Sequence, residues 1–304
     1  MSLFEKLPRR VTVVEVGPRD GLQNEAATLP AQVKTRFVEL LADAGLPVVE
    51  VTSFVSPRAI PQLADADSVL PAVRRRAGVR YPVLVPNLRG LERARAAGAD
   101  AICVFTAASE EFARRNINMS IAESLRAFAP VVAEARAAGM WTRGYVSTAF
   151  GCPYAGEVAP AAVVDVSLRL LELGCEEISV GDTIGVATPV STERVVSAVL
   201  ERVAAGRLAL HLHDTYERAL ANVTVGLQLG VTTYDSSAGG LGGCPFAPGA
   251  AGNLATERLV GLLDALSVET GVDLEAVRRA SAFLRRALAG ETSGLPQRGS
   301  SGTD

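Results

Sequence analysis

Histidine and cysteine, the side chains most often used to bind transition metals or to attack substrates, are scarce in this sequence. The 304 residues contain two histidines, both in the run ALHLHDTY at 209–216, and four cysteines, at positions 103, 152, 175 and 244. No two cysteines stand at the short spacing C-x-x-C. We therefore expect free thiols in a reducing cytoplasm, where each cysteine is either core filler or a reactive group.

Excess positive charge and long apolar runs are also missing. The formal net charge of -3 offers no electrostatic footprint for nucleic acid, and we interpret the three arginines at 74–76 as a solvated helix end. No stretch reaches the roughly 18 uncharged apolar residues of a membrane-spanning helix. The first residues, MSLFEKLPRR, lack the apolar core of a signal peptide. We expect neither nucleic acid nor a membrane as a partner.

What the sequence does contain is an alternation of short β-branched runs with longer segments of helical period. Eight strands are predicted, at 11–17, 47–53, 80–86, 101–107, 142–148, 176–182, 208–214 and 232–238. Eight strand–helix units indicate an α/β fold, a closed (β/α)8 TIM barrel. A doubly wound open sheet is the alternative, but no G-x-G-x-x-G follows the first strand.

Helix signals set the element boundaries and the extent of the domain. Ser120 with Glu123 forms a capping box, and Thr188 is an N-cap followed by proline. Five glycines stand where a helix ends before a strand: Gly45, Gly98, Gly139, Gly174 and Gly230. We expect one catalytic domain over 1–290, with a barrel at about 11–265, an additional C-terminal helix at about 273–289 and a disordered tail at 291–304.

Polar residues gather where the predicted strands end, which is the catalytic face of a TIM barrel. His211 and His213 are two apart, so a strand places both imidazoles on one face. Asp20 follows the first strand, and Asn253 stands at the start of the last barrel helix. Two nitrogens with added oxygen ligands suit Mg²⁺ or Mn²⁺. A pair of satisfied rim histidines without a metal is the alternative interpretation.

Two further features of this rim suggest catalysis. Arg19, next to Asp20, could stabilise an enolate oxygen, or it could only neutralise Glu50 or Asp182. The glycine-rich loop 239–252 is long enough for a lid, and Cys244 at its centre is badly placed for core packing. A lid thiol could act as an acid, a base or a nucleophile. The loop lacks the Lys-Ser/Thr ending of a P-loop.

The chain resembles the 3-hydroxy-3-methylglutaryl-CoA lyase family from about Val11 to Leu263. The matching runs are EVGPRDGLQNE, VEVTSFVSP, NINMSIAES, GYVSTAFGCPY, ISVGDTIGVATP, LHLHDTYERALAN and GLGGCPFAPGAAGNLATE. Homocitrate and isopropylmalate synthases share the H-x-H-D-T strand, whereas GLGGCP together with GPRDGLQNE is more specific to the lyases. The resemblance implies metal-assisted retro-Claisen cleavage of 3-hydroxy-3-methylglutaryl-CoA to acetoacetate and acetyl-CoA, without a redox or prosthetic cofactor, by a homodimer.

The resemblance also implies individual roles. It implies a divalent ion on Asp20, His211, His213 and Asn253, an enolate-stabilising Arg19 and a proton-transferring Cys244. The base is left open between His211 and His213. Acidic residues tied to the site are Glu50, Asp182 and Glu257; weaker candidates are Gln23, Ser53 and Ser179; the lid is Gly242, Gly243, Cys244 and Pro245. Apart from the resemblance, Arg143 and Asn116 are candidate contacts for coenzyme A, but neither stands in a recognisable motif.

Three positions depart from the family pattern, and two other functions stay open. Glu217 stands where glycine is common, Arg258 where an acidic residue is common, and Thr106 where a smaller residue is common, which puts the acyl pocket in doubt. The same chemistry on another 3-hydroxy-acyl-CoA, or on a free 4-hydroxy-2-oxo acid, is one alternative. A metal-binding barrel that serves as a scaffold without catalysis is the other.

Overall fold

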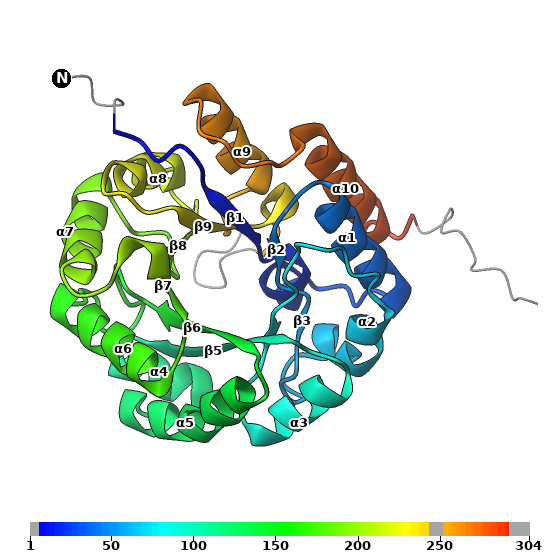
Figure 1. Ribbon diagram of the computed structural model, residues 1–304, viewed down its shortest axis with the longest axis horizontal. Coiled ribbons are helices and arrows are strands. Elements are labelled where there is room, and N and C mark those ends of the chain that lie inside the picture. Colours follow the sequence, from blue (N-terminus) through cyan, green and yellow to red (C-terminus); the bar gives the residue numbers. More distant parts are fainter. Residues whose placement is uncertain (1–5, 243–251, 292–304) are drawn as a thin grey trace, which may run out of the picture.

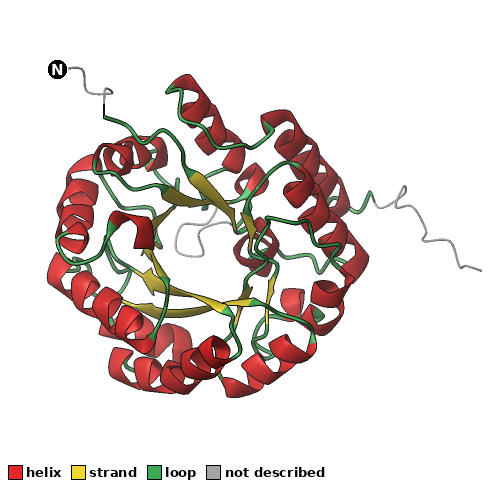
Figure 2. Cartoon of the chain, in the orientation of Figure 1, coloured by secondary structure: helices red, strands yellow, loops and turns green. Residues whose placement is uncertain are grey.

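A ring of helices surrounds a barrel of parallel strands in the computed structural model, which describes residues 6–242 and 252–291 (Figures 1 and 2). The strands are short and almost fully buried, because helices cover their outer face and packed side chains fill the inside. They are β1 (Thr12–Glu15), β2 (Val48–Val49), β3 (Thr52–Ser53), β4 (Val83–Leu84), β5 (Ala101–Ala107), β6 (Trp141–Ser147), β7 (Glu177–Asp182), β8 (Leu208–Leu212) and β9 (Thr233–Ser236).

The nine described strands fill eight positions around the barrel. Their order is β2-β1-β9-β8-β7-β6-β5-β4-β3, all parallel, and β2 and β3 are the two halves of the second predicted strand. Between the halves, the amide of Glu50 donates to Glu15 O at 2.8 Å on one side. The amide of Val51 donates to Pro82 O at 3.0 Å on the other side, which closes the barrel. The predicted TIM-barrel fold is confirmed.

The helices follow the strands as the alternation predicts. They are α1 (Ala31–Asp43), α2 (Ala66–Ala72), α3 (Leu88–Ala96), α4 (Glu110–Ile117), α5 (Ile121–Ala137), α6 (Pro160–Leu173), α7 (Pro189–Leu200), α8 (Ala219–Gln228), α9 (Thr256–Ala265) and α10 (Leu274–Leu288). The additional C-terminal helix is α10, which packs on α1 (Figure 1). Within the described part of the chain, no helix is both long and apolar enough to cross a membrane. The predicted tail lies outside the described residues, apart from Glu291.

Local capping signals are confirmed. The Ser120 side chain accepts from the Glu123 amide while the Glu123 carboxylate accepts from the Ser120 amide. Thr188 caps α7 in the same reciprocal way with Ser191. All five predicted helix-ending glycines have positive φ values, between +72° and +114°. These positions start and stop the helices that carry the chain back to the next strand.

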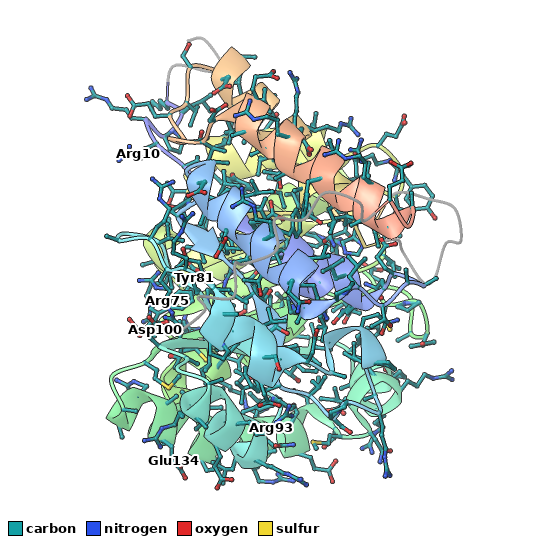
Figure 3. All side chains as sticks on the ribbon, turned by 90° about the vertical axis from the view of Figure 1, so that its right-hand side faces the viewer. Arg10, Arg75, Tyr81, Arg93, Asp100 and Glu134 are labelled. Atoms are coloured by element: carbon teal, nitrogen blue, oxygen red, sulfur yellow. The ribbon has the colours of Figure 1, made fainter. Side chains whose placement is uncertain are left out.

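Two predictions of local structure are wrong. The helix α4 is missing from the predicted alternation, although Ser109 caps it by accepting from the Phe112 amide. The segment that ends in the three arginines leaves the helix early, because α2 ends at Ala72 and Val73 is extended. Arg75 lies over the Tyr81 ring and pairs with Asp100 at 2.6 Å (Figure 3). The arginines therefore lie beyond the end of α2, but they are exposed, as predicted, and form ion pairs with Asp43 of α1 and with Asp100 before β5.

Candidate active site

The C-terminal ends of β1 and β8 bring together three side chains that could hold a metal ion. After β1 the chain turns through a π-helical segment, Gly17–Gly21, in which the amides of Asp20 and Gly21 both donate to Val16 O. This turn points Asp20 toward His211 of β8 and His213 just beyond the end of that strand. Single ligand atoms of Asp20, His211 and His213 all lie within 4.8 Å of one another. Insertions of this π type often occur at functional sites.

The two imidazoles lie side by side but have different surroundings. Their ring centroids are 5.3 Å apart. His211 Nδ1 lies 3.3 Å from Asp235 Oδ2, and its Nε2 faces Asp20 Oδ2 at 3.9 Å. Burial, with a smaller effect from His211, lowers the pKa of His213 to about 3, and its Nδ1 has no hydrogen-bond partner. His213 is therefore a neutral imidazole at physiological pH.

Arg19 is clamped between two carboxylates at the mouth of the barrel. Its Nη1 lies 2.6 Å from Asp20 Oδ1 and its Nη2 lies 2.9 Å from Glu50 Oε2. The guanidinium also lies 5.4 Å from the centre of the Tyr145 ring. Burial disfavours the charge of Arg19, but Glu50 and Asp20 outweigh this and raise its pKa well above the usual value. A fixed positive charge therefore stands beside the metal-binding group.

Asp20 is held in place from several sides. Burial disfavours its ionisation, but the charge of Arg19 outweighs this and lowers the pKa of Asp20 to about 2. Gln23 donates to Asp20 Oδ1 at 3.0 Å. Asn253 donates its side-chain nitrogen to Asp20 Oδ2 at 2.8 Å and to Leu241 O at 3.0 Å. In this orientation the side-chain nitrogen of Asn253 holds Asp20 in place. The side-chain amide would have to rotate before its oxygen could bind an ion, so the role of Asn253 as a ligand stays a prediction.

The loop that contains the predicted lid begins against this group. Gly242 has a φ of +93°, and a Cβ there would lie 2.6 Å from the side-chain nitrogen of Asn253. Only glycine lets the backbone pass this close to the site. The predicted lid residues Gly243, Cys244 and Pro245 lie outside the described residues. The other three cysteines, Cys103, Cys152 and Cys175, are free and buried, as predicted.

The acidic and hydroxyl candidates occupy different places. Glu50 is fully buried and accepts from Tyr145 at 3.0 Å, and burial raises its pKa. Asp182 does not pair with Arg19: its Oδ2 accepts from the Ala187 amide at 3.0 Å, and burial raises its pKa to about 7. Asp182 thus shapes the loop after β7, and of the two carboxylates named for Arg19 only Glu50 contacts it.

The supporting residues extend from the site to the helices. Ser53 accepts from the Val55 amide at 3.3 Å and so shapes the turn after β3. Ser179 donates to Asp235 Oδ2 at 2.9 Å. Glu257 accepts from the Gly239 amide at 2.9 Å and from the Ser281 hydroxyl, which joins the loop after β9 to α9 and α10.

A cavity of about 630 Å³ opens beside these residues. Its wall includes Arg19, Asp20, His211 and His213, together with aromatic and aliphatic side chains from β4, β5, α4 and α5. It also includes Asn116, one of the two candidate contacts for coenzyme A. Arg143, the other predicted contact, is 1% exposed and pairs with Asp235 and Glu177 inside the barrel. That prediction for Arg143 is wrong, because the alternation of β6 turns its side chain into the lumen.

The three departures from the family pattern lie away from the described cavity wall. Thr106 bonds to Ser124 of α5 at 2.7 Å, so it faces the helix layer. Arg258 forms an ion pair with Asp214. Glu217 has a φ of +58°, a left-handed conformation that glycine adopts without strain. None of the three is among the residues that line the described cavity.

Three buried polar residues of the site were missed by the sequence reasoning. Tyr145 joins Glu50 to Arg143, with its hydroxyl 3.2 Å from Arg143 Nη1. Asp235 lies beside His211. Glu15 accepts from the Gly17 and Ala238 amides and from the Thr256 hydroxyl. A charged residue or tyrosine at an inward position of a barrel strand was the signal that could have found Tyr145 and Asp235. Glu15 follows the inward-facing Val14 and points outward to Thr256 of α9, so this signal does not apply to it.

The donor set fits a divalent cation. It supplies one carboxylate oxygen and two imidazole nitrogens, the carboxylate stays ionised, and His213 is neutral. The unpartnered nitrogen of buried His213 is a further indication, because buried polar atoms normally have a partner. Three protein ligands leave coordination positions open for substrate oxygens.

Comparison with known proteins agrees with this geometry. A family model described as HMGL-like matches residues 10–284. The mitochondrial hydroxymethylglutaryl-CoA lyase of Rattus norvegicus is 53% identical over 96% of this chain and 90% of its own length. The HMG-CoA lyase structure from Bacillus subtilis has a TM-score of 0.92 at 46% identity and covers 96% of this chain and 97% of its own. An HMG-CoA lyase from Acinetobacter baumannii, in complex with coenzyme A and 3-methylmalate, has a TM-score of 0.87 at 36% identity and covers 98% of this chain and 99% of its own. The chain belongs to the HMGL-like family, together with these hydroxymethylglutaryl-CoA lyases.

Proposed function

We propose that this protein cleaves 3-hydroxy-3-methylglutaryl-CoA to acetoacetate and acetyl-CoA. The observation that carries the proposal is the clamped guanidinium of Arg19 beside Asp20, His211 and His213 at the mouth of a large cavity. In this reaction the C2–C3 bond breaks and the C3 hydroxyl becomes the ketone of acetoacetate. The electron pair of the broken bond stays on C2, which leaves as the enolate of acetyl-CoA and then takes up a proton.

Asp20, His211 and His213 would hold a divalent ion, Mg²⁺ or Mn²⁺, and Asn253 is a fourth candidate ligand. A bound ion supplies Lewis acidity, which polarises hydroxyl and carbonyl oxygens and makes the hydroxyl easier to deprotonate. The cleavage requires no redox or prosthetic cofactor. The two imidazoles are the candidate acceptors for the hydroxyl proton, and His213 is neutral and therefore able to accept one.

Arg19 stabilises the negative charge that develops on the thioester oxygen. Its guanidinium is fixed by Asp20 and Glu50 before the substrate arrives, so little reorganisation accompanies the reaction. Glu50 is itself held by the hydroxyl of Tyr145. Cys244 delivers the proton to the enolate carbon from the lid formed with Gly242, Gly243 and Pro245, and of these only Gly242 is described.

The same proposal includes the class of ligand, the oligomeric state and the cellular compartment of the protein. An acyl-CoA ligand is supported by the coenzyme A in the relative from Acinetobacter baumannii, and Asn116 on the cavity wall is a candidate contact. A homodimer is proposed from the family resemblance. The relatives carry both mitochondrial and cytoplasmic names, so the cytoplasm stays a prediction.

The test is turnover on a substrate panel with and without a chelator. Purified protein with Mg²⁺ or Mn²⁺ is expected to release acetoacetate from 3-hydroxy-3-methylglutaryl-CoA, and EDTA is expected to abolish the release. Other 3-hydroxy-acyl-CoA thioesters and a 4-hydroxy-2-oxo acid complete the panel. Faster cleavage of one of these would move the assignment to that substrate, and no cleavage of any would leave the scaffold alternative.

A matched pair of variants tests the role of Arg19. Arg19→Gln is expected to lower kcat by roughly 10²–10³-fold, the usual cost of losing one stabilising donor. Arg286→Gln, on the exposed face of α10, removes the same charge far from the site and is expected to leave kcat unchanged. Equal rates for the two variants would contradict the role proposed for Arg19.

A further inference from the structure

Asp235 stands beside His211 because of the strand register. The strands β8 and β9 are parallel neighbours, and His211 pairs with Asp235 across them. Paired residues on neighbouring strands point to the same face of the sheet, here into the barrel. Asp235 is 2% exposed, so solvent does not compete for its carboxylate.

Two hydrogen-bond donors and one imidazole nitrogen converge on this carboxylate. Arg143 Nη2 lies 2.7 Å from Oδ1, and the Ser179 hydroxyl lies 2.9 Å from Oδ2. His211 Nδ1 lies 3.3 Å from Oδ2. The contact with Arg143 is a fully buried ion pair, so the carboxylate stands there as the anion that balances the guanidinium. An ionised carboxylate has no hydrogen to donate, so every contact must supply its own.

Because the carboxylate of Asp235 can only accept hydrogen bonds, it determines which nitrogen of a neutral His211 carries the hydrogen. Nδ1 must be the donor to Asp235, and the lone pair is then on Nε2, the atom that faces Asp20. The Tyr145 ring meets the imidazole edge-on, with centroids 6.4 Å apart, and restricts its rotation. His213 is different, since its buried Nδ1 has no partner.

We infer that Asp235 is a positioning residue for His211, which selects the Nδ1–H tautomer and turns Nε2 toward the ion site. The inference rests on the metal site proposed above. Carboxylates that bind the outer nitrogen of a metal-binding histidine orient the ring and make it a better ligand. A purely structural role, as the counter-ion of Arg143 in the barrel core, is the competing explanation.

The tautomer can be read directly because the chain has two histidines. Untagged protein labelled with ¹⁵N-histidine, free of metal and at a pH where both imidazoles are neutral, is expected to show one ring protonated on Nδ1 and unprotonated on Nε2. His211→Asn assigns that signal. If His211 carries its hydrogen on Nε2 in the wild-type protein, the inference is overturned, whatever any variant does.

Metal affinity supplies the second readout. Asp235→Asn offers an amide that can donate to Nδ1, so it is expected to favour the Nε2–H tautomer and to weaken Mn²⁺ binding by roughly 10–100-fold in calorimetry. Arg143 keeps Glu177 as a counter-ion in this variant. The control is Tyr234→Phe, which removes a hydroxyl from the same strand on the face turned to α8. It is expected to leave both the tautomer and the Mn²⁺ affinity unchanged.

The outcomes separate this inference from the proposed function. If Asp235→Asn folds and keeps the wild-type tautomer and Mn²⁺ affinity, Asp235 is only the counter-ion of Arg143, while cleavage by the wild-type protein is unaffected. If the wild-type protein binds Mn²⁺ but cleaves no thioester, the function fails and the tautomer result stands. Absence of Mn²⁺ binding to the wild-type protein would overturn the metal site and this inference with it.

Discussion

Replacing Glu15 by glutamine removes a buried carboxyl group that joins three segments around the site. Oε1 of Glu15 accepts from the Gly17 amide at 2.8 Å and from the Ala238 amide at 2.9 Å, and Oε2 accepts from the Thr256 hydroxyl at 2.7 Å. Glutamine keeps one oxygen for the two amides, and its NH₂ can donate to the Thr256 oxygen. The change therefore removes the ionisation while it preserves the shape of the contact.

The expected effect is a change in the pH dependence of stability. Burial raises the pKa of Glu15 from 4.5 to about 7, so between these values the folded protein holds a proton that the unfolded chain has released. Stability is therefore lost as pH rises through this window. A tenfold difference in proton affinity corresponds to about 1.4 kcal/mol, so the wild-type protein should lose about 2–3 kcal/mol from this group between pH 5 and pH 8. The neutral variant lacks this loss.

Urea unfolding of both proteins across this pH range measures the effect. The stability of Glu15→Gln relative to wild type is expected to rise by about 2–3 kcal/mol from pH 5 to pH 8. Glu134→Gln, at an exposed site on α5, is the control, and its difference from wild type should stay constant (Figure 3). A constant difference for Glu15→Gln as well would show that Glu15 is ionised throughout, and would refute the reasoning.

Three further predictions concern other parts of the molecule. Asp182→Asn should also remove a loss of stability with rising pH, because burial raises the pKa of Asp182 to about 7. If the free energy of unfolding of this variant, measured in urea, falls with pH as steeply as that of the wild-type protein, the prediction is wrong. Gly45→Ala should cost about 2 kcal/mol or more, since its φ is +91° and a Cβ would lie 2.4 Å from Gly271 O. Gly78→Ala, with a φ of +81° and nothing within 4 Å, should cost about 1 kcal/mol, so equal costs in thermal unfolding would refute the steric argument. Light scattering should give twice the 31.7 kDa mass of one chain if the homodimer forms, and the mass of a single chain would exclude it.

The metal-binding group was predictable because its geometry follows from two short-range rules. Residues two apart on a strand share a face, which pairs His211 with His213. The C-terminal ends of all strands in a TIM barrel share one rim, which brings Asp20 to them. Neither rule needs the register between strands. The family resemblance, which the comparisons confirm, rests on the same motifs.

The errors have two sources: contacts between elements distant in the chain, and a helix too short to show a periodic pattern. Arg143 was a candidate contact for coenzyme A; in the structure Asp235, 92 residues away, supplies the charge that permits its burial. The helix before the arginines at 74–76 ends at Ala72, and the arginines pair with Asp43 and Asp100 of other elements. The helix α4 is short, and its sequence has too few turns for a clear helical period.

The amino-acid sequence by itself determined the strand–helix alternation and the helix ends, because each depends on neighbours within a few positions, and it placed the candidate metal ligands at the strand ends. Only the tertiary structure decided which buried polar residues contact the residues of the site. Asp235 behind His211, and Tyr145 between Glu50 and Arg143, depend on how separate strands align in the closed barrel. That alignment is set by packing and hydrogen bonding over the whole sheet, so no local pattern encodes it.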